Sequence, residues 1–446
     1  MQDLQTDPSV SGERVAPSVV KPRAIAPWVH SELQTANPIV RSMIPAAIGF
    51  APVLLMLLTW TPDAQQRLPV FISKWFALPT FIVEIFVIAI ALRRKLLAAA
   101  RNQAAPPLRR AVLLALLTIA VFTAAFVAPN PFISLVRTGM WIVHALFALS
   151  VMHLCGEAFE RGSVTTAFMA GFALFALLFV AFVTQVPDPT TFNWVGALPA
   201  AIHIRHLGFY AGAVVGMCIG RFALVSGRTG WTATFAVATL GIALAMATGS
   251  RGNLVALGIA FAAGMLLLPA LRQRQVVLGV LGSAVLGLVL ASCLPLPEGL
   301  GGLGRAVAAT TGGAPASGRT ILWLSTIGAI WERPLFGHGE AQLAFVMKGE
   351  NPEHPHNFLL QVLLAWGVIG ALCIAILAIP FALHTVRGVR RLGGEWLPPF
   401  LAMLVLLAYS AYDGTLYHPL SLSIFATCAG LVARGTLVGQ TTEPTH

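Results

Sequence analysis

The sequence predicts an all-α polytopic membrane protein, and two observations carry this prediction. Of the 446 residues, 57% are hydrophobic and only 10% are charged, whereas soluble domains carry roughly 25% charged residues. The apolar residues are gathered into long runs, and a helix that crosses the hydrocarbon core of a bilayer needs about 20 of them. Because a water-soluble core cannot hold this much apolar surface, we expect a bundle of membrane-spanning helices.

The length of a membrane helix divides the chain into about twelve spans. Residues 1–42 are polar and contain prolines, without the features of a cleaved signal peptide, so we expect a disordered cytoplasmic tail. Spans one to nine fall within residues 43–294, spans ten to twelve within 357–434, and a second cytoplasmic tail follows at 435–446. The predicted spans are 43–60, 69–92, 111–128, 131–154, 164–186, 207–224, 231–248, 253–270, 275–294, 357–383, 397–412 and 417–434.

The basic residues predict the orientation of these spans. Alternate connections carry most of the 28 Lys and Arg, and such an excess marks the cytoplasmic side. Both termini are therefore expected in the cytoplasm, with the connections 187–206, 249–252, 295–356 and 413–416 outside. Because the basic residues are scattered between apolar runs rather than gathered in a patch, membrane lipids are the expected partners and nucleic acid is not.

The long connection 295–356 interrupts the apolar pattern. Within it, residues 319–331 place apolar side chains at helical spacing. We predict a helix lying at the external membrane surface, with Trp323 and Trp331 as interfacial anchors.

Titratable chemistry is concentrated at the end of this connection. His356 lies at the external end of span 357–383, and a neutral imidazole is suited to act as a general base near pH 7. Glu353 or Asn357 is expected to orient the ring. Gly367 and Gly370 follow about three helical turns later, which indicates either a groove without side chains beneath the imidazole or helix packing through small residues.

Several cations are predicted at the same external level. Arg205 and Arg251 lie in short turns between spans, and Arg319 begins the surface helix. Lys74 and Arg137 lie roughly 7 to 10 Å below the external ends of their spans. Charges inside a bilayer are costly, so these two side chains either extend to the headgroups or contribute to a polar site.

The four tyrosines of the chain also fall on the external side. They either form an ordinary interfacial belt or line a polar ligand, and the second reading makes Tyr210 a candidate binding residue. The tyrosines are Tyr210, Tyr409, Tyr412 and Tyr417.

Other common chemistries lack their motifs. No paired acidic motif lies on the external side, and there is no P-loop, Gly-x-Ser-x-Gly elbow or His/Glu metal spacing. The five cysteines show no CxxC spacing. We therefore expect neither a metal nor a cofactor, and disfavour nucleotide-sugar-dependent transferases and serine hydrolases.

With its long external connection, the signature His356-Asn357-x9-Gly367-x-x-Gly370 and the turn Ser250-Arg251-Gly252, the chain resembles the bacterial O-antigen ligase and polymerase superfamily. The resemblance implies a glycosyltransferase C-type fold in the inner membrane, with a periplasmic active site and metal-independent, inverting catalysis. The implied donor is a glycan on undecaprenyl diphosphate. For a ligase the implied acceptor is the lipid A-core oligosaccharide of lipopolysaccharide.

The family's loop histidine maps onto His356 and its turn arginine onto Arg251. Arginine presents a planar, permanently charged fork that suits phosphate oxygens. We therefore expect Arg205 and Arg251, joined by Arg137, Arg319 or Lys74, to hold the diphosphate while His356 deprotonates the acceptor. The groove over Gly367 would admit the polyprenyl chain.

Three alternatives stay open. An O-antigen polymerase or a protein O-oligosaccharyltransferase would use the same donor with another acceptor. A solute transporter, from a different class, would place its polar groups near the midplane between internal repeats, whereas here they gather at one surface.

Overall fold

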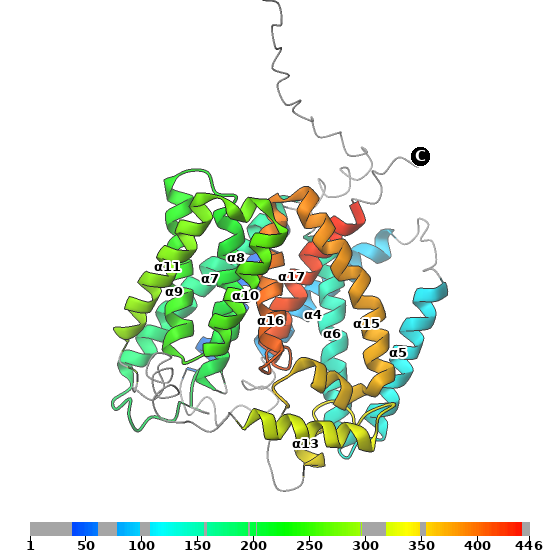
Figure 1. Cartoon of the computed structure of the whole chain (residues 1–446). Coiled ribbons are helices and arrows are strands. Elements are labelled where there is room, and N and C mark those ends of the chain that lie inside the picture. Colours follow the sequence, from blue (N-terminus) through cyan, green and yellow to red (C-terminus); the bar gives the residue numbers. More distant parts are fainter. Residues whose placement is uncertain are drawn as a thin grey trace, which may run out of the picture. The chain divides into compact units, whose positions relative to one another are not determined.

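The computed structural model describes residues 38–60, 78–98, 108–155, 158–194, 197–201, 203–294, 296, 318–347 and 354–438. The chain divides into two units, residues 1–41 and 42–446, and of the first only the opening turn of a helix is described. In the second unit the described residues form helices and no strand (Figure 1). The predicted all-α fold is therefore confirmed.

The helices that precede the long connection run one after another with short turns between several of them. They are α2 (Pro38–Leu58), α4 (Leu78–Ala98), α5 (Leu108–Phe126), α6 (Pro131–Leu154), α7 (Ala158–Gln185), the 3-10 turn η1 (Ile204–His206), α8 (Leu207–Phe222), α9 (Arg228–Ala247), α10 (Arg251–Leu267), the 3-10 turn η2 (Pro269–Arg272) and α11 (Arg274–Ser292).

The described residues of the long connection form two helices, and three more helices follow in the described part of the chain. These elements are α13 (Arg319–Glu332), α14 (Leu343–Val346), α15 (Phe358–Leu392), the 3-10 turn η3 (Gly394–Trp396), α16 (Leu397–Ser410) and α17 (Pro419–Val438).

A helix lies over at least part of every predicted span. In the described part of the chain, five stretches are long and apolar enough to cross a membrane by length and composition. The chain is therefore a multi-pass helical protein, while the count of twelve spans stays a prediction. The qualifying stretches are Pro131–Leu154, Arg161–Gln185, Arg228–Ala247, Arg274–Ser292 and Phe358–Leu392.

Local sequence explains where the helices at the site begin. Asn130 caps α6 by accepting a hydrogen bond from the N–H of Ile133, and a proline occupies the first helical position. Asn357 caps α15 in the same way through the N–H of Leu360. Both caps fix the end of a helix that faces the long connection.

Helix α15 is broken at Gly367, where the backbone has φ +63°. A Cβ at this position would lie 2.3 Å from the carbonyl oxygen of Leu335. The N–H of Val368 donates to the carbonyl of Pro334 at 2.8 Å. The segment 334–339 is thus bonded into the break, and only glycine provides both the left-handed backbone and the space.

This packing corrects the predicted groove beneath His356. The space over Gly367 is filled by the backbone of Leu335 and Phe336, and a Cβ at Gly370 would meet the side chain of Trp366. These glycines therefore serve close packing within the fold, and no side-chain-free channel lies under the imidazole.

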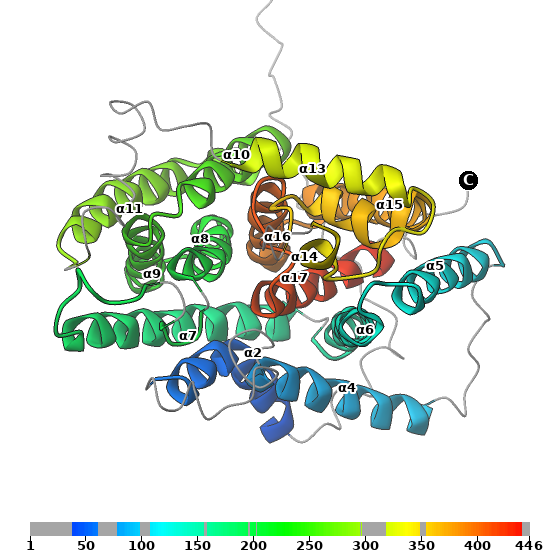
Figure 2. The same cartoon turned by 90° about the horizontal axis from the view of Figure 1, so that it is seen from below.

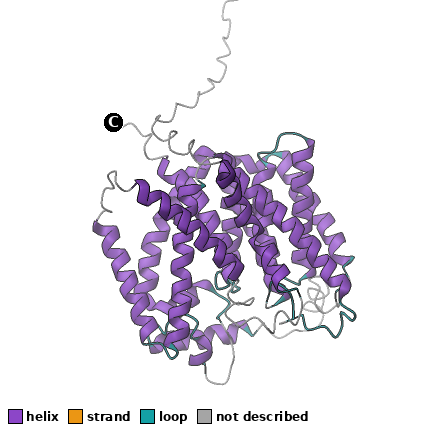
Figure 3. Cartoon of the chain, turned by 180° about the vertical axis from the view of Figure 1, so that it is seen from behind, coloured by secondary structure: helices purple, strands orange, loops and turns teal. Residues whose placement is uncertain are grey.

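Helix α13 lies across one end of the second unit, nearly at right angles to the long helices (Figure 1). Seen from that end, α13 runs beside α15, and α16 and α17 lie behind it, with α8 next to α16 (Figure 2). The opposite view shows the long helices of this unit running roughly side by side, with loops gathered at their ends (Figure 3). The end covered by α13 carries the site described next.

Candidate functional site

Segments from five distant parts of the chain meet at the end covered by α13. The turn before α15 carries His356, the connection between α16 and α17 carries Asp413, and the first residue of α13 is Arg319. Arg205 lies in η1 just before α8, and Arg251 begins α10. Both belong to the same place, since the charges of Asp413, Arg319 and Arg251 all act on Arg205. Residues separated by more than 200 positions thus share one site.

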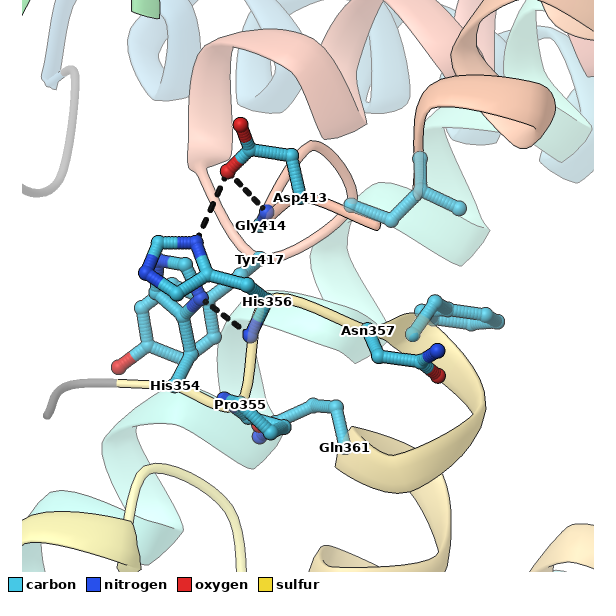
Figure 4. Close-up of a pocket in the computed structure, with 10 residues that line it drawn as sticks. His354, Pro355, His356, Asn357, Gln361, Asp413, Gly414 and Tyr417 are labelled. Carbon is cyan, nitrogen blue, oxygen red and sulfur yellow. Dashed lines mark hydrogen bonds and ion pairs between the residues drawn. The ribbon is translucent and has the colours of Figure 1, made fainter. Parts of the chain in front are cut away.

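At its centre, His356 and Arg319 both contact the carboxylate of Asp413. The Nδ1 atom of His356 lies 2.9 Å from Oδ1 of Asp413, and Nη2 of Arg319 donates to Oδ2 at 3.3 Å. The N–H of Gly414 also donates to Oδ1 at 2.8 Å. Figure 4 shows the imidazole directed at the carboxylate from the opposite loop.

These contacts determine which nitrogen of His356 carries the proton. Burial opposes ionisation of Asp413, but the hydrogen bond and charge of His356, the charge of Arg319 and the N–H of Gly414 together lower the pKa of Asp413 below its ordinary value. Asp413 is therefore a carboxylate that only accepts hydrogen bonds, so Nδ1 of His356 is the N–H. In the neutral ring the lone pair is then on Nε2, and this is the tautomer that a general base requires.

The predicted role of Asn357 in orienting the ring is therefore corrected. Asn357 does not hold the imidazole: its side chain caps α15 and donates to the carbonyl of Ala411 at 2.8 Å. Glu353 lies outside the described residues. Asp413 takes this role, and the only signal in the sequence was an acidic residue in a short external hairpin otherwise rich in tyrosine.

The backbone of Arg205 is fixed by a hydrogen bond within its own turn, whereas its side chain has a buried donor without a hydrogen-bond partner among the described residues. Its backbone N–H donates to Nδ1 of His203 at 3.0 Å, while its buried Nε has no hydrogen-bond partner among the described residues. Burial lowers the pKa of the guanidinium, Asp413 opposes this shift, and the charges of Arg319 and Arg251 add to it. A buried donor without a partner is costly, and an anion between these three arginines would supply one.

The turn Ser250-Arg251-Gly252 is held by two tyrosines of the connection around Asp413. The hydroxyl of Ser250 hydrogen bonds to the hydroxyl of Tyr409, and the hydroxyl of Tyr412 donates to the carbonyl of Gly252. A Cβ at Gly252 would lie 2.7 Å from the Tyr412 ring. The small residue lets the rings approach, which fixes Arg251 at the exposed start of α10.

Three other candidates differ in their surroundings. Arg137 is buried, with Nη2 donating to the carbonyl of Tyr417 at 2.6 Å and its guanidinium over the Tyr417 ring. Tyr210 is buried in α8, edge-on to Phe172 and Phe175. Lys74 lies outside the described residues. The structure therefore brings Arg205, Arg251, Arg319 and His356 together and places Arg137 and Tyr210 in packed surroundings.

The predicted membrane anchors of α13 also differ from one another. Trp331 is 76% exposed, as an interfacial anchor requires. Trp323 instead donates through Nε1 to the carbonyl of Pro355 at 2.8 Å, one residue before His356. Trp323 is partly buried and supports the turn of the site, and its place at the membrane interface stays a prediction.

Three histidine rings lie behind His356, and sequence reasoning gave them no role. The centroids of His206 and His418 are 3.9 Å apart, and those of His354 and His418 are 5.3 Å apart. Burial, with a contribution from the charge of His203, lowers the pKa of His206 to about 3. These rings come from three separate loops. Two of them, His206 and His354, lie close in sequence to the candidate residues Arg205 and His356, and this was the only signal in the sequence.

The arrangement can perform one kind of chemistry well. A pocket lined by His354, His356, Gln361, Asp413 and Tyr417 places the base at its surface, and permanently charged guanidinium groups lie near it. This combination suits removal of a proton from a hydroxyl beside an anionic leaving group.

Comparison with known families gives one match. Residues 235–375 match the family described as O-antigen ligase, which confirms the resemblance to that superfamily. The matched region includes Arg251, Arg319 and His356, whereas Arg205 and Asp413 come from outside it. No curated protein matches the chain.

Proposed function

Because residues 235–375 match the O-antigen ligase family, we propose that the chain is a membrane glycosyltransferase that acts as an O-antigen ligase. Its donor is a glycan on undecaprenyl diphosphate, and its acceptor is a hydroxyl of the lipid A-core oligosaccharide. Transfer takes place at the periplasmic face of the bacterial inner membrane. The observation that carries the proposal is a histidine held by an ionised carboxylate next to three arginines.

The reaction follows from the state of His356. Its Nε2 lone pair takes the proton from the acceptor hydroxyl as that oxygen attacks the anomeric carbon of the donor sugar. The bond between this carbon and the diphosphate oxygen breaks, and its electron pair leaves with undecaprenyl diphosphate. Attack from the face opposite the leaving group inverts the anomeric configuration.

The arginines act on the leaving group. Arg205, Arg251 and Arg319 hold the diphosphate, whose negative charge increases as the bond breaks. Fixed cations aimed at developing charge lower the barrier, because they need no reorganisation during the reaction. The Nε of Arg205, buried and without a partner among the described residues, is the donor that most needs such an anion.

Asp413 has two roles in this mechanism. It keeps His356 in the tautomer that accepts a proton at Nε2, and it stabilises the imidazolium that forms. Through Oδ2 it also orients Arg319. The base and one phosphate ligand are therefore positioned by a single carboxylate.

The experiment that tests the function is transfer by purified protein in detergent with EDTA present. The substrates are an undecaprenyl-diphosphate glycan and lipid A-core, and His356→Ala is the matched variant. Glycosylated lipid A-core that is formed by the wild type and lost by the variant supports the ligase. Longer lipid-linked glycans without ligated core would instead identify a polymerase, and no glycan transfer at all would revive the transporter.

A further inference from the structure

The imidazole of His354 is buried beside the base and has a specific contact. The side chain is 5% exposed, and its Nδ1 accepts a hydrogen bond from the backbone N–H of His356 at 3.2 Å. Figure 4 shows this bond beneath the one between His356 and Asp413. The base is thus held at two points, its ring by Asp413 and its backbone by His354.

The backbone of His356 needs such support. Its φ of +52° lies in the left-handed region, which residues other than glycine rarely adopt. A conformation of this kind persists only where the surroundings impose it. On one side of the turn Trp323 donates to the carbonyl of Pro355, and on the other the N–H of His356 is bonded to His354.

The fold makes room for the His354 ring. A Cβ on Gly414 would lie 2.0 Å from Cε1 of His354, so the residue after Asp413 has to be glycine while the ring is there. The ring centroids of Tyr417 and His418 lie 4.7 and 5.3 Å away. Another aromatic ring would satisfy this packing, but the N–H of His356 needs a hydrogen-bond acceptor, which Phe lacks.

The surroundings keep His354 able to accept. Burial, followed by the charge of His356, lowers the pKa of His354 well below its ordinary value. The charge of Asp413 opposes this shift, while His206 and Arg137 add to it. These groups face the ring from the 411–418 connection, from η1 and from α6, and their sum leaves the imidazole neutral.

We propose that His354 is a positioning residue for the transfer reaction, which holds the left-handed backbone of His356 through Nδ1 and so aims the base at the acceptor hydroxyl. The inference rests on the proposed function. The same geometry recurs at Arg205, whose N–H donates to Nδ1 of the histidine two residues earlier.

Two variants separate the acceptor from the ring. His354→Phe keeps an aromatic ring and removes the acceptor, whereas His354→Asn removes the ring and keeps an acceptor that bonds the N–H two residues on, as in an Asx-turn. We expect kcat to fall roughly 10- to 100-fold in the Phe variant with the donor KM little changed, because small displacements of a reacting group cost about this much. The Asn variant should recover most of that loss.

His418→Phe is the matched control, because this neighbouring buried ring does not accept the hydrogen bond from the backbone of His356. The kcat of this variant should stay within about threefold of wild type. Equal melting temperatures in detergent would show that the variants are folded. Wild-type kcat in the Phe variant, or an Asn variant as impaired as the Phe variant, would overturn the inference.

A readout that does not depend on activity keeps this test separate from that of the function. Diethyl pyrocarbonate acylates accessible imidazoles, and peptide mass spectrometry gives the rate at His356. We expect this rate to change at least about threefold in the Phe variant, because the turn is released, and to match wild type in the Asn variant. An inactive wild-type protein would defeat the proposed function, whereas an unchanged acylation rate in the Phe variant would defeat the role of His354.

Discussion

At the scale of single residues, the carboxylate of Asp413 decides the chemistry of the site. It bonds Nδ1 of His356 and Nη2 of Arg319 with different oxygens. Both partners favour its ionised form, as does the N–H of Gly414. The tautomer of His356 therefore depends on a residue in another loop.

Replacing Asp413 by Asn should lower kcat by about 10²- to 10⁴-fold, the range typical of general acid-base assistance. The amide can donate to Nδ1 of His356, which favours the tautomer with its proton on Nε2. Steady-state transfer kinetics measure this effect. Asp188→Asn is the matched control, since Asp188 is exposed and bonds only the nearby Thr190 and Thr191; a similar loss in both variants would remove the assigned role of Asp413.

At the scale of elements, the break in α15 couples the long connection to the helix that begins at the base. The segment 334–339, which follows α13, bonds to the backbone on both sides of Gly367. Helix α13 in turn contributes Arg319 and Trp323 to the site. The break therefore helps to fix the position of α13 relative to His356.

Gly367→Ala should destabilise the protein by more than about 2 kcal/mol, because a left-handed backbone costs a side chain about 1–3 kcal/mol and the added Cβ overlaps the carbonyl of Leu335. Thermal unfolding in detergent, followed by intrinsic fluorescence, would show the loss. Gly258→Ala in α10 is the control, since nothing lies within 4 Å of its added Cβ. Equal melting temperatures for the two variants would refute this account of the break.

At the scale of the whole described fold, the starts of α8, α10 and α13 and the loops before α15 and α17 meet at one end. Their side chains stack as well as bond, and the rings of His206, Phe209 and His418 all contact one another. Buried neutral imidazoles resist protonation in the folded protein. The stability of this end should therefore depend on pH.

The sign follows from the pKa of His206, which burial lowers from 6.5 to about 3. Between these pH values the unfolded chain binds the proton and the folded chain does not. The free energy of unfolding therefore falls as the pH drops from about 6.5 towards 3, by at most roughly 1.4 kcal/mol per pH unit for this residue. His206→Phe, whose ring can stack on Phe209, should show a shallower decline. Melting temperatures in detergent between pH 7 and pH 4 compare the two proteins, and parallel curves would contradict the prediction.

Sequence alone determined the helical class, the approximate helix positions and the identity of the central histidine. Composition and run length suffice for the first two, because the bilayer requires long apolar helices. Arg205, Arg251, Arg319 and His356 were found because they lie in the external connections between apolar spans or at their ends, where polar side chains gather at one level.

Only the tertiary structure decided the partners of these residues. Asp413 and Trp323 reach the His356 turn from distant segments, and no periodicity within one helix relates segments so far apart in sequence; the bond from His354 is local but depends on the left-handed turn. The roles of Gly367 and Tyr210 were likewise set by packing, since whether a small or aromatic residue faces a ligand or a neighbouring element depends on what the fold brings against it. The local sequence thus determines which chemical groups are present, and contacts between distant segments determine how these groups are placed.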